Sequence, residues 1–160
     1  MKGSQIRLKL FLDRLNIPSD ISTLEDRKVV QKVVFLGQKA GADLGYQYGW
    51  YLMGPYSPEL TQDYFILASD LSKGEASYKE YKLIDELNQK LDSIKELLKV
   101  PIGIPLSQPD WLELLASVVY LLNFQGETNA RIRLRDKKPH LADYFDVALS
   151  NLRQYRIINT

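Results

Sequence analysis

The side chains in this sequence that could transfer a proton or bind a metal ion are few. The 160 residues include one histidine, His140, and no cysteine. A histidine can move a proton near neutral pH, and the nearby Arg135 could stabilise negative charge on a phosphate. A lone histidine without cysteine excludes a multi-histidine metal site, a thiolate zinc site, an iron–sulfur site and a cysteine nucleophile. We therefore expect no metal and no cofactor.

Basic side chains concentrate in the C-terminal part of the sequence. Residues 127–160 contain seven Lys/Arg and four Asp/Glu, whereas the whole chain has a net charge of only +1. Such an asymmetry permits contacts with phosphates, although a basic run is more often a solvated helix face. In a nucleic-acid-binding protein, the residues expected to make these contacts are Lys28, Lys32, Arg131, Arg133, Arg135, Lys137 and Lys138.

An aromatic segment from Tyr48 to Leu60, YGWYLMGPYSPEL, is the most distinctive string in the chain. Its composition predicts a short strand, then a turn at Gly54-Pro55-Tyr56, and a new helix that Ser57 caps. The aromatic side chains belong either to the core or to a contact surface, since aromatic clusters are typical of interfaces. For the second interpretation, the candidate partner-binding residues are Trp50, Tyr51, Tyr56, Ser57 and Glu59.

Mostly helical elements must position these side chains. The spacing of apolar residues predicts helices over 5–15, 23–40, 58–73, 85–99, 111–124, 127–135 and 140–154. Ser22 and Glu25 have capping-box spacing, with Thr23 as the alternative cap. Residues 46–52 are expected to form a short strand, and 78–84 a second strand or an extended connector. The helix that Asp110 would cap is apolar on most sides, which predicts a central position.

The composition is typical of a globular protein. The apolar fraction is 45% and the charged fraction 26%, and a chain of this length can bury a core without disulfides. We predict a single mainly α domain over residues 1–160, compact and with a small β-ribbon, whose softest internal boundary is the loop 100–109. No segment approaches the ~20 apolar residues of a membrane span, and no targeting segment is visible. We therefore expect no membrane partner and a cytoplasmic location.

Four segments of the chain share their pattern with a known family. The helix 28–36, KVVQKVVFL, and residues 51–60, YLMGPYSPEL, resemble the lysine–glutamine–lysine helix and the Gly-Pro-Tyr-Ser-x-Glu-Leu element of the small prokaryotic YwgA-like proteins. Segments 111–120 and 138–140 are similar to that family as well. The chain also resembles, more distantly, the Panacea domain of antitoxins. Usual copies have Leu-Gln-Lys where this chain has Val30-Gln31-Lys32. The resemblance implies a helical module that acts by binding, and a winged-helix-like arrangement is one form that this module could take.

Three functions follow from these observations. The first is a non-catalytic regulatory or interaction module that binds a protein partner, in an antitoxin-like or conflict-system setting. The second is a winged-helix-like DNA or RNA binder, in which the helix after Ser57 enters a groove. The third is a dimeric ribonuclease, because the spacing of Arg135 and His140 resembles the arginine–histidine motif of the HEPN ribonucleases. We predict the first and keep the other two as alternatives.

Overall fold

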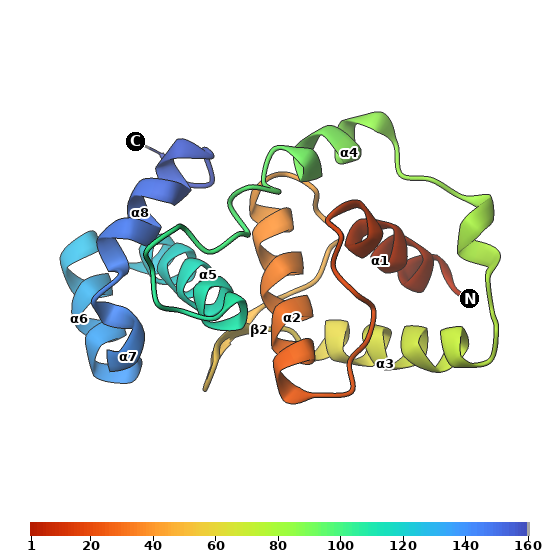
Figure 1. Ribbon diagram of the computed structural model, residues 1–160, viewed down its shortest axis with the longest axis horizontal. Helices are drawn as coiled ribbons and strands as arrows, with labels where there is room; N and C mark the ends of the chain where they lie inside the picture. Colours follow the sequence, from red (N-terminus) through yellow and green to blue (C-terminus); the bar gives the residue numbers. More distant parts are fainter. Residues whose placement is uncertain (160) are drawn as a thin grey trace.

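Helices and one small β-ribbon make up residues 1–159, the part of the chain described by a computed structural model (Figure 1). The N-terminal elements are α1 (Gly3–Arg14), α2 (Leu24–Lys39), the strands β1 (Gly49–Tyr51) and β2 (Gly54–Tyr56), and α3 (Pro58–Ser72). The 3-10 turn η1 (Ser77–Glu80) follows, then α4 (Asp85–Asp92), α5 (Gln108–Phe124), α6 (Glu127–Lys137), α7 (Pro139–Ala142) and α8 (Phe145–Gln154). The prediction of a mainly helical fold with a small β-ribbon is confirmed, and the two strands of the ribbon are antiparallel.

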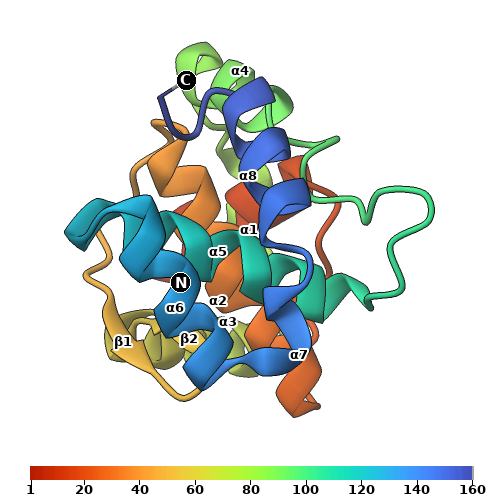
Figure 2. The ribbon, with the colours of Figure 1, turned by 90° about the vertical axis from the view of Figure 1, so that its left-hand side faces the viewer.

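The helices α2 and α5 form the centre of the molecule. In Figure 1, α2 stands in the middle, with α1 and α3 on one side and α5 to α8 on the other. Figure 2 shows α5 crossing α2, with the hairpin β1–β2 below them. Every side chain of α5 from Trp111 to Val119 is buried, which confirms the predicted central helix. Because that helix is apolar on nearly all sides, only neighbours on several faces can shield it from water.

Side-chain caps determine where three of the helices begin. Thr23, the alternative cap, begins α2 in place of Ser22. Ser57 caps α3 as predicted. Ser107 caps α5 earlier than expected, so Asp110 is not the cap but lies in the first turn of that helix. Its carboxylate is therefore available for a partner outside α5.

Other boundaries differ from the sequence pattern. Of the two alternatives for residues 78–84, the strand is not formed: the 3-10 turn η1 reaches Glu80, and 81–84 connect it to α4, with extended backbone at Tyr81 and Ile84. The partner of β1 is Gly54–Tyr56, which we expected to be only a turn. The helix predicted over 85–99 ends at Asp92 and continues as turns, because the Ser93 hydroxyl bonds to the Lys90 carbonyl at 2.6 Å and competes with the helical pattern. The predicted last helix is two helices, α7 and α8, separated at 143–144.

The loop 100–109 does not separate two cores. The Trp111 indole N–H donates to the Leu97 carbonyl across this loop, at 2.9 Å. The buried apolar side chains form one cluster that extends from Leu8 to Leu152. Within residues 1–159, the helices are all too short or too polar to cross a membrane.

Candidate functional site

The hairpin β1–β2 is anchored closely to α5. Trp50 pairs with Pro55 and Tyr51 with Gly54, which leaves Leu52 and Met53 at the turn. Gly54 has a φ of +89°, and a Cβ atom at this position would lie 2.6 Å from the Ser117 hydroxyl oxygen. Both the left-handed backbone and the close approach to α5 require glycine.

A polar contact holds the start of α3 against α2. The Gln31 side-chain amide donates to the Ser57 carbonyl at 2.9 Å, and the Ser57 backbone N–H donates back to Gln31 Oε1 at 2.9 Å. The Ser57 hydroxyl accepts from the Leu60 N–H at 3.3 Å and is fully buried. Ser57, a predicted partner contact, therefore positions the helix, whereas Glu59 in the next turn is exposed.

The predicted aromatic contacts divide between two faces of the hairpin. Trp50 lies against α5, with its ring 5.6 Å from that of Tyr120. Tyr51 is 49% exposed and meets Tyr56 edge to face at 5.1 Å. Neighbouring residues of a strand point to opposite sides, so Trp50 packs inward while Tyr51 and Tyr56 line a cavity.

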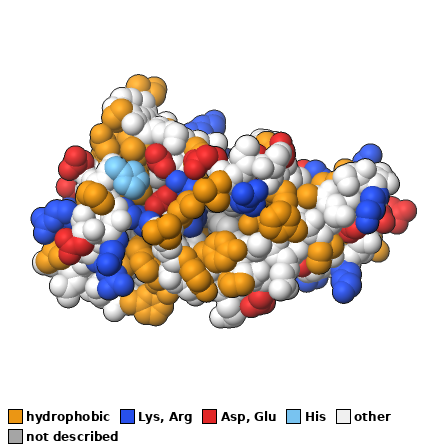
Figure 3. All heavy atoms as spheres, turned by 90° about the horizontal axis from the view of Figure 1, so that it is seen from below, with side chains coloured by type: hydrophobic (Ala, Val, Ile, Leu, Met, Phe, Trp, Pro, Cys, Tyr) orange, Lys and Arg blue, Asp and Glu red, His pale blue; other side chains and the backbone are white. Residues whose placement is uncertain are grey.

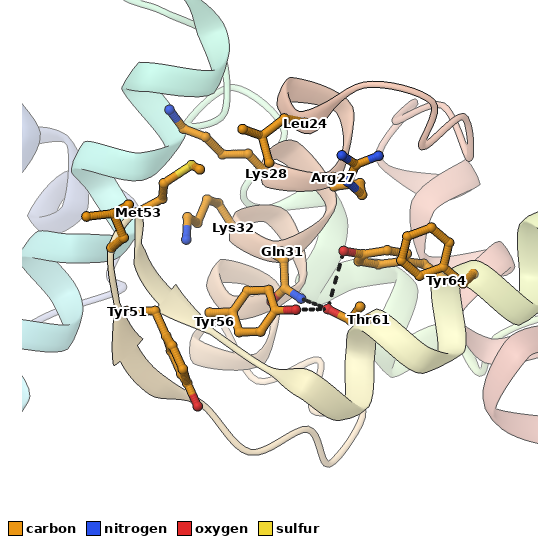
Figure 4. A pocket seen from close by; sticks show the side chains of 12 residues that line it. Leu24, Arg27, Lys28, Gln31, Lys32, Tyr51, Met53, Tyr56, Thr61 and Tyr64 are labelled. Carbon is orange, nitrogen blue, oxygen red and sulfur yellow. Dashed lines mark hydrogen bonds between the residues drawn. The ribbon is translucent and has the colours of Figure 1, made fainter.

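That cavity opens between the hairpin, α2 and α3 and has a volume of about 300 Å³. Figure 4 shows Lys28 and Lys32 projecting from α2 on the side of Met53, and the hydroxyls of Tyr56, Thr61 and Tyr64 joined on the other side. Thr61 Oγ1 lies 2.5 Å from the Tyr56 hydroxyl and 3.3 Å from that of Tyr64. The lining residues are Leu24, Arg27, Lys28, Gln31, Lys32, Tyr51, Leu52, Met53, Tyr56, Thr61, Tyr64 and Phe65, with no Asp or Glu.

Charged side chains form an interior network behind the cavity, which we call the lysine cluster; its members are Lys28, Lys32, Lys138, Asp110 and Glu113. Lys28 Nζ lies 2.7 Å from Glu113 Oε1 and 2.9 Å from Asp110 Oδ1. Lys138 Nζ lies 2.7 Å from Glu113 Oε2 and donates to the Leu52 carbonyl at 2.6 Å. Both oxygens of the buried Glu113 carboxylate are thus occupied, one by each lysine.

Lys32 is the cation in this cluster without a carboxylate in contact. It is 2% exposed, and its Nζ donates to the Pro55 carbonyl at 2.6 Å. Burial lowers the pKa of Lys32 to about 7; the charges of Lys138 and Lys28 lower it as well, and that of Glu113 opposes them. For Lys28, burial also acts to lower the pKa, but the hydrogen bonds to Glu113 and Asp110 outweigh it and leave the pKa raised. Contact with carboxylates therefore gives Lys28 a raised pKa, whereas Lys32, one helical turn away and without such a contact, has a lowered one.

Three lysines expected to contact nucleic acid lie in the interior. Lys28, Lys32 and Lys138 are buried and engaged in the lysine cluster. Their ammonium groups are therefore held inside the protein and are not presented on its surface to the phosphates of a nucleic-acid backbone, contrary to what the sequence led us to expect of these three residues. The physical reason is that Glu113, a buried carboxylate, requires cations inside the core.

Unlike these three buried lysines, most of the basic side chains of α6 lie on the surface. Arg131 is paired with Asp146 of α8, and its guanidinium lies 4.3 Å from the centre of the Phe145 ring. Arg133, Arg135 and Lys137 are exposed. The expected basic patch is thus reduced to three side chains on one short helix.

The two residues of the ribonuclease alternative lie on different helices. Arg135 is in the last turn of α6 and His140 is in α7, and both are exposed. Within residues 1–159, no group of three or more His, Asp or Glu side chains could hold a metal ion.

Three buried polar residues, Glu113, Gln31 and Ser117, were not among the predicted site residues. Glu113 was nevertheless visible as the single charged residue in the mostly apolar run from Trp111 to Val119. Gln31 occupies a core-facing position of α2 beside valines, which is a comparable signal. Ser117 has a buried hydroxyl without a hydrogen-bond partner, and nothing in the sequence distinguishes it.

We compared the chain with family models, curated proteins and solved structures. No family model, curated protein or solved structure matches this chain.

Proposed function

We propose that this protein is a non-catalytic module that binds a protein partner through the surface around the hairpin tip. The observation that carries the proposal is the gathering of exposed apolar side chains at the mouth of one cavity. These side chains, which we call the hairpin face, are Leu24, Tyr51, Leu52 and Phe65. Leu52 is 89% exposed. Figure 3, seen from the side on which the hairpin lies, shows hydrophobic side chains across the middle of the surface.

Exposed apolar and aromatic side chains beside a concave site are typical of interaction surfaces. The anchoring of the hairpin supports this use, because Gly54, Pro55 and Ser57 are fixed to the core and present the tip without a large loss of entropy on binding. The antitoxin-like setting rests on the resemblance to YwgA-like proteins and the Panacea domain.

Charge favours a protein over a nucleic acid as the partner. The helix α3, which would enter a groove in the nucleic-acid alternative, carries Glu59, Asp63 and Asp70 and no lysine or arginine. Carboxylates on that helix would repel phosphates. A protein surface with apolar side chains fits the hairpin face better, because the four side chains of that face carry no charge.

The test compares two variants of the full chain. In the first, Tyr51→Ser is combined with Leu52→Ser; in the control, Ile102→Ser changes an exposed apolar residue outside the cavity lining. Proteins retained by the wild-type chain from an extract of its source cells are identified, purified and titrated against all three forms. We expect a partner whose affinity falls at least tenfold for the double variant and is unchanged for the control. Equal affinities for wild type and double variant would overturn the proposal.

A further inference from the structure

We propose that the cavity beside the hairpin is a binding site for a small organic carboxylate with an apolar body, whose carboxylate pairs with Lys32. The site adjoins the hairpin face, whose four side chains also line the cavity, but the inference does not depend on a protein partner. The inference rests on two observations: the lysine cluster has more lysines than carboxylates, and the cavity beside it is lined by no acidic side chain.

The lysine cluster has one more cation than it has carboxylates. Glu113 is shared by Lys28 and Lys138, and Asp110 contacts Lys28. Lys32 contacts a carbonyl oxygen only, which uses one of its three donors. A buried cation without a counter-charge is costly, and an anion that enters the cavity would offset that cost.

The cavity is suited to such an anion. Arg27, Lys28 and Lys32 line it and no acidic side chain does, so its charge is complementary to a carboxylate. Apart from Gln31 and Thr61, the rest of the wall is tyrosine, phenylalanine, leucine and methionine, which would cover an aromatic or aliphatic body. The volume of about 300 Å³ is at the lower end of the ~300–1,000 Å³ range of small-molecule sites, which favours a small acid.

The probe is 3-phenylpropionate, titrated into the full chain by calorimetry, with amide shifts in two-dimensional NMR to locate the site. Its neutral counterpart, 3-phenylpropionamide, has the same shape without the charge. We expect the acid to bind at least tenfold more tightly than the amide at pH 6, with shifts at the hairpin and α2. This comparison uses wild-type protein and so does not depend on how a variant folds.

Two further readouts assign the binding to Lys32. In Lys32→Met the affinity for the acid should fall to that for the amide, whereas Lys99→Met, a change on an exposed turn, should leave it unchanged. In the wild type, the dissociation constant should rise up to tenfold per pH unit above pH 7, as Lys32 loses its proton. The other charged or titratable groups facing the cavity or the cluster are Arg27, Lys28, Asp110, Glu113, Lys138, Tyr51, Tyr56, Tyr64 and His140, whose charge acts on Asp110.

Three results would overturn the proposal. They are equal affinities for the acid and the amide, undiminished binding of the acid to a folded Lys32→Met variant, and the absence of binding at millimolar acid. None of them bears on the hairpin face, whose test uses a protein partner.

Discussion

Replacing Lys32 with methionine should flatten the dependence of folding stability on pH. In the unfolded chain this lysine has its ordinary pKa of 10.5, and in the folded protein burial lowers the pKa to about 7. Between these values the unfolded chain binds a proton that the folded chain does not hold. Stability therefore rises with pH in this window.

The magnitude follows from the size of this shift. One proton bound only by the unfolded state changes the free energy of unfolding by ~1.4 kcal/mol per pH unit. At pH 7 about half of the folded molecules still carry the proton, so the gain from pH 7 to pH 9 is roughly 2 kcal/mol. Folding raises the pKa of both Tyr46 and Tyr48, mainly through burial, so their contribution is present below pH 10 and lost above it. Measurements should therefore stop at pH 9.

The assay is urea unfolding followed by tryptophan fluorescence at pH 7, 8 and 9. Three proteins are compared, namely wild type, Lys32→Met and Lys99→Met, the last as a control on an exposed lysine. We expect the wild type and the control to gain stability in parallel, and Lys32→Met to lack roughly 2 kcal/mol of that gain. The comparison uses slopes, because Lys32→Met also removes the hydrogen bond to the Pro55 carbonyl and so changes stability at every pH. Parallel curves for wild type and Lys32→Met would refute the assignment of a depressed pKa to this lysine.

Two further predictions concern the hairpin and the basic helix. Gly54→Ala should cost about 2–4 kcal/mol in urea unfolding, because it combines a strained φ with a contact too close to α5. Gly74→Ala has a similar φ and open space around it, so it should cost only about 1–2 kcal/mol; equal losses would contradict the packing argument. Labelled duplex DNA and single-stranded RNA should bind weakly at ~50 mM salt and leave the RNA intact, and Arg133→Ala with Arg135→Ala should change nothing. Tight binding that collapses at ~200 mM salt would favour the nucleic-acid alternative, and RNA cleavage abolished by His140→Ala would favour the ribonuclease.

The sequence alone determined the class of fold and many of its helices. Apolar residues at helical spacing identified the central helix α5, because a segment that is apolar on most sides and too short to span a membrane must be shielded from water by the rest of the protein. Ser57 and Pro58 specified the start of α3 through local capping chemistry. These features depend on neighbours a few residues apart, so periodicity and local side-chain chemistry are sufficient to predict them.

Tertiary structure decided which charges are inside and where the cavity lies. Lys28, Lys32 and Lys138 look like surface cations in the sequence, yet they converge on the lysine cluster because Glu113 is carried into the core by its helix. The residues that meet there are up to 110 positions apart, counted from Lys28 to Lys138. No local pattern encodes that convergence. It arises when burial of the apolar faces of α2 and α5 brings a cation and a carboxylate together, and the cost of separating buried charges then keeps them paired.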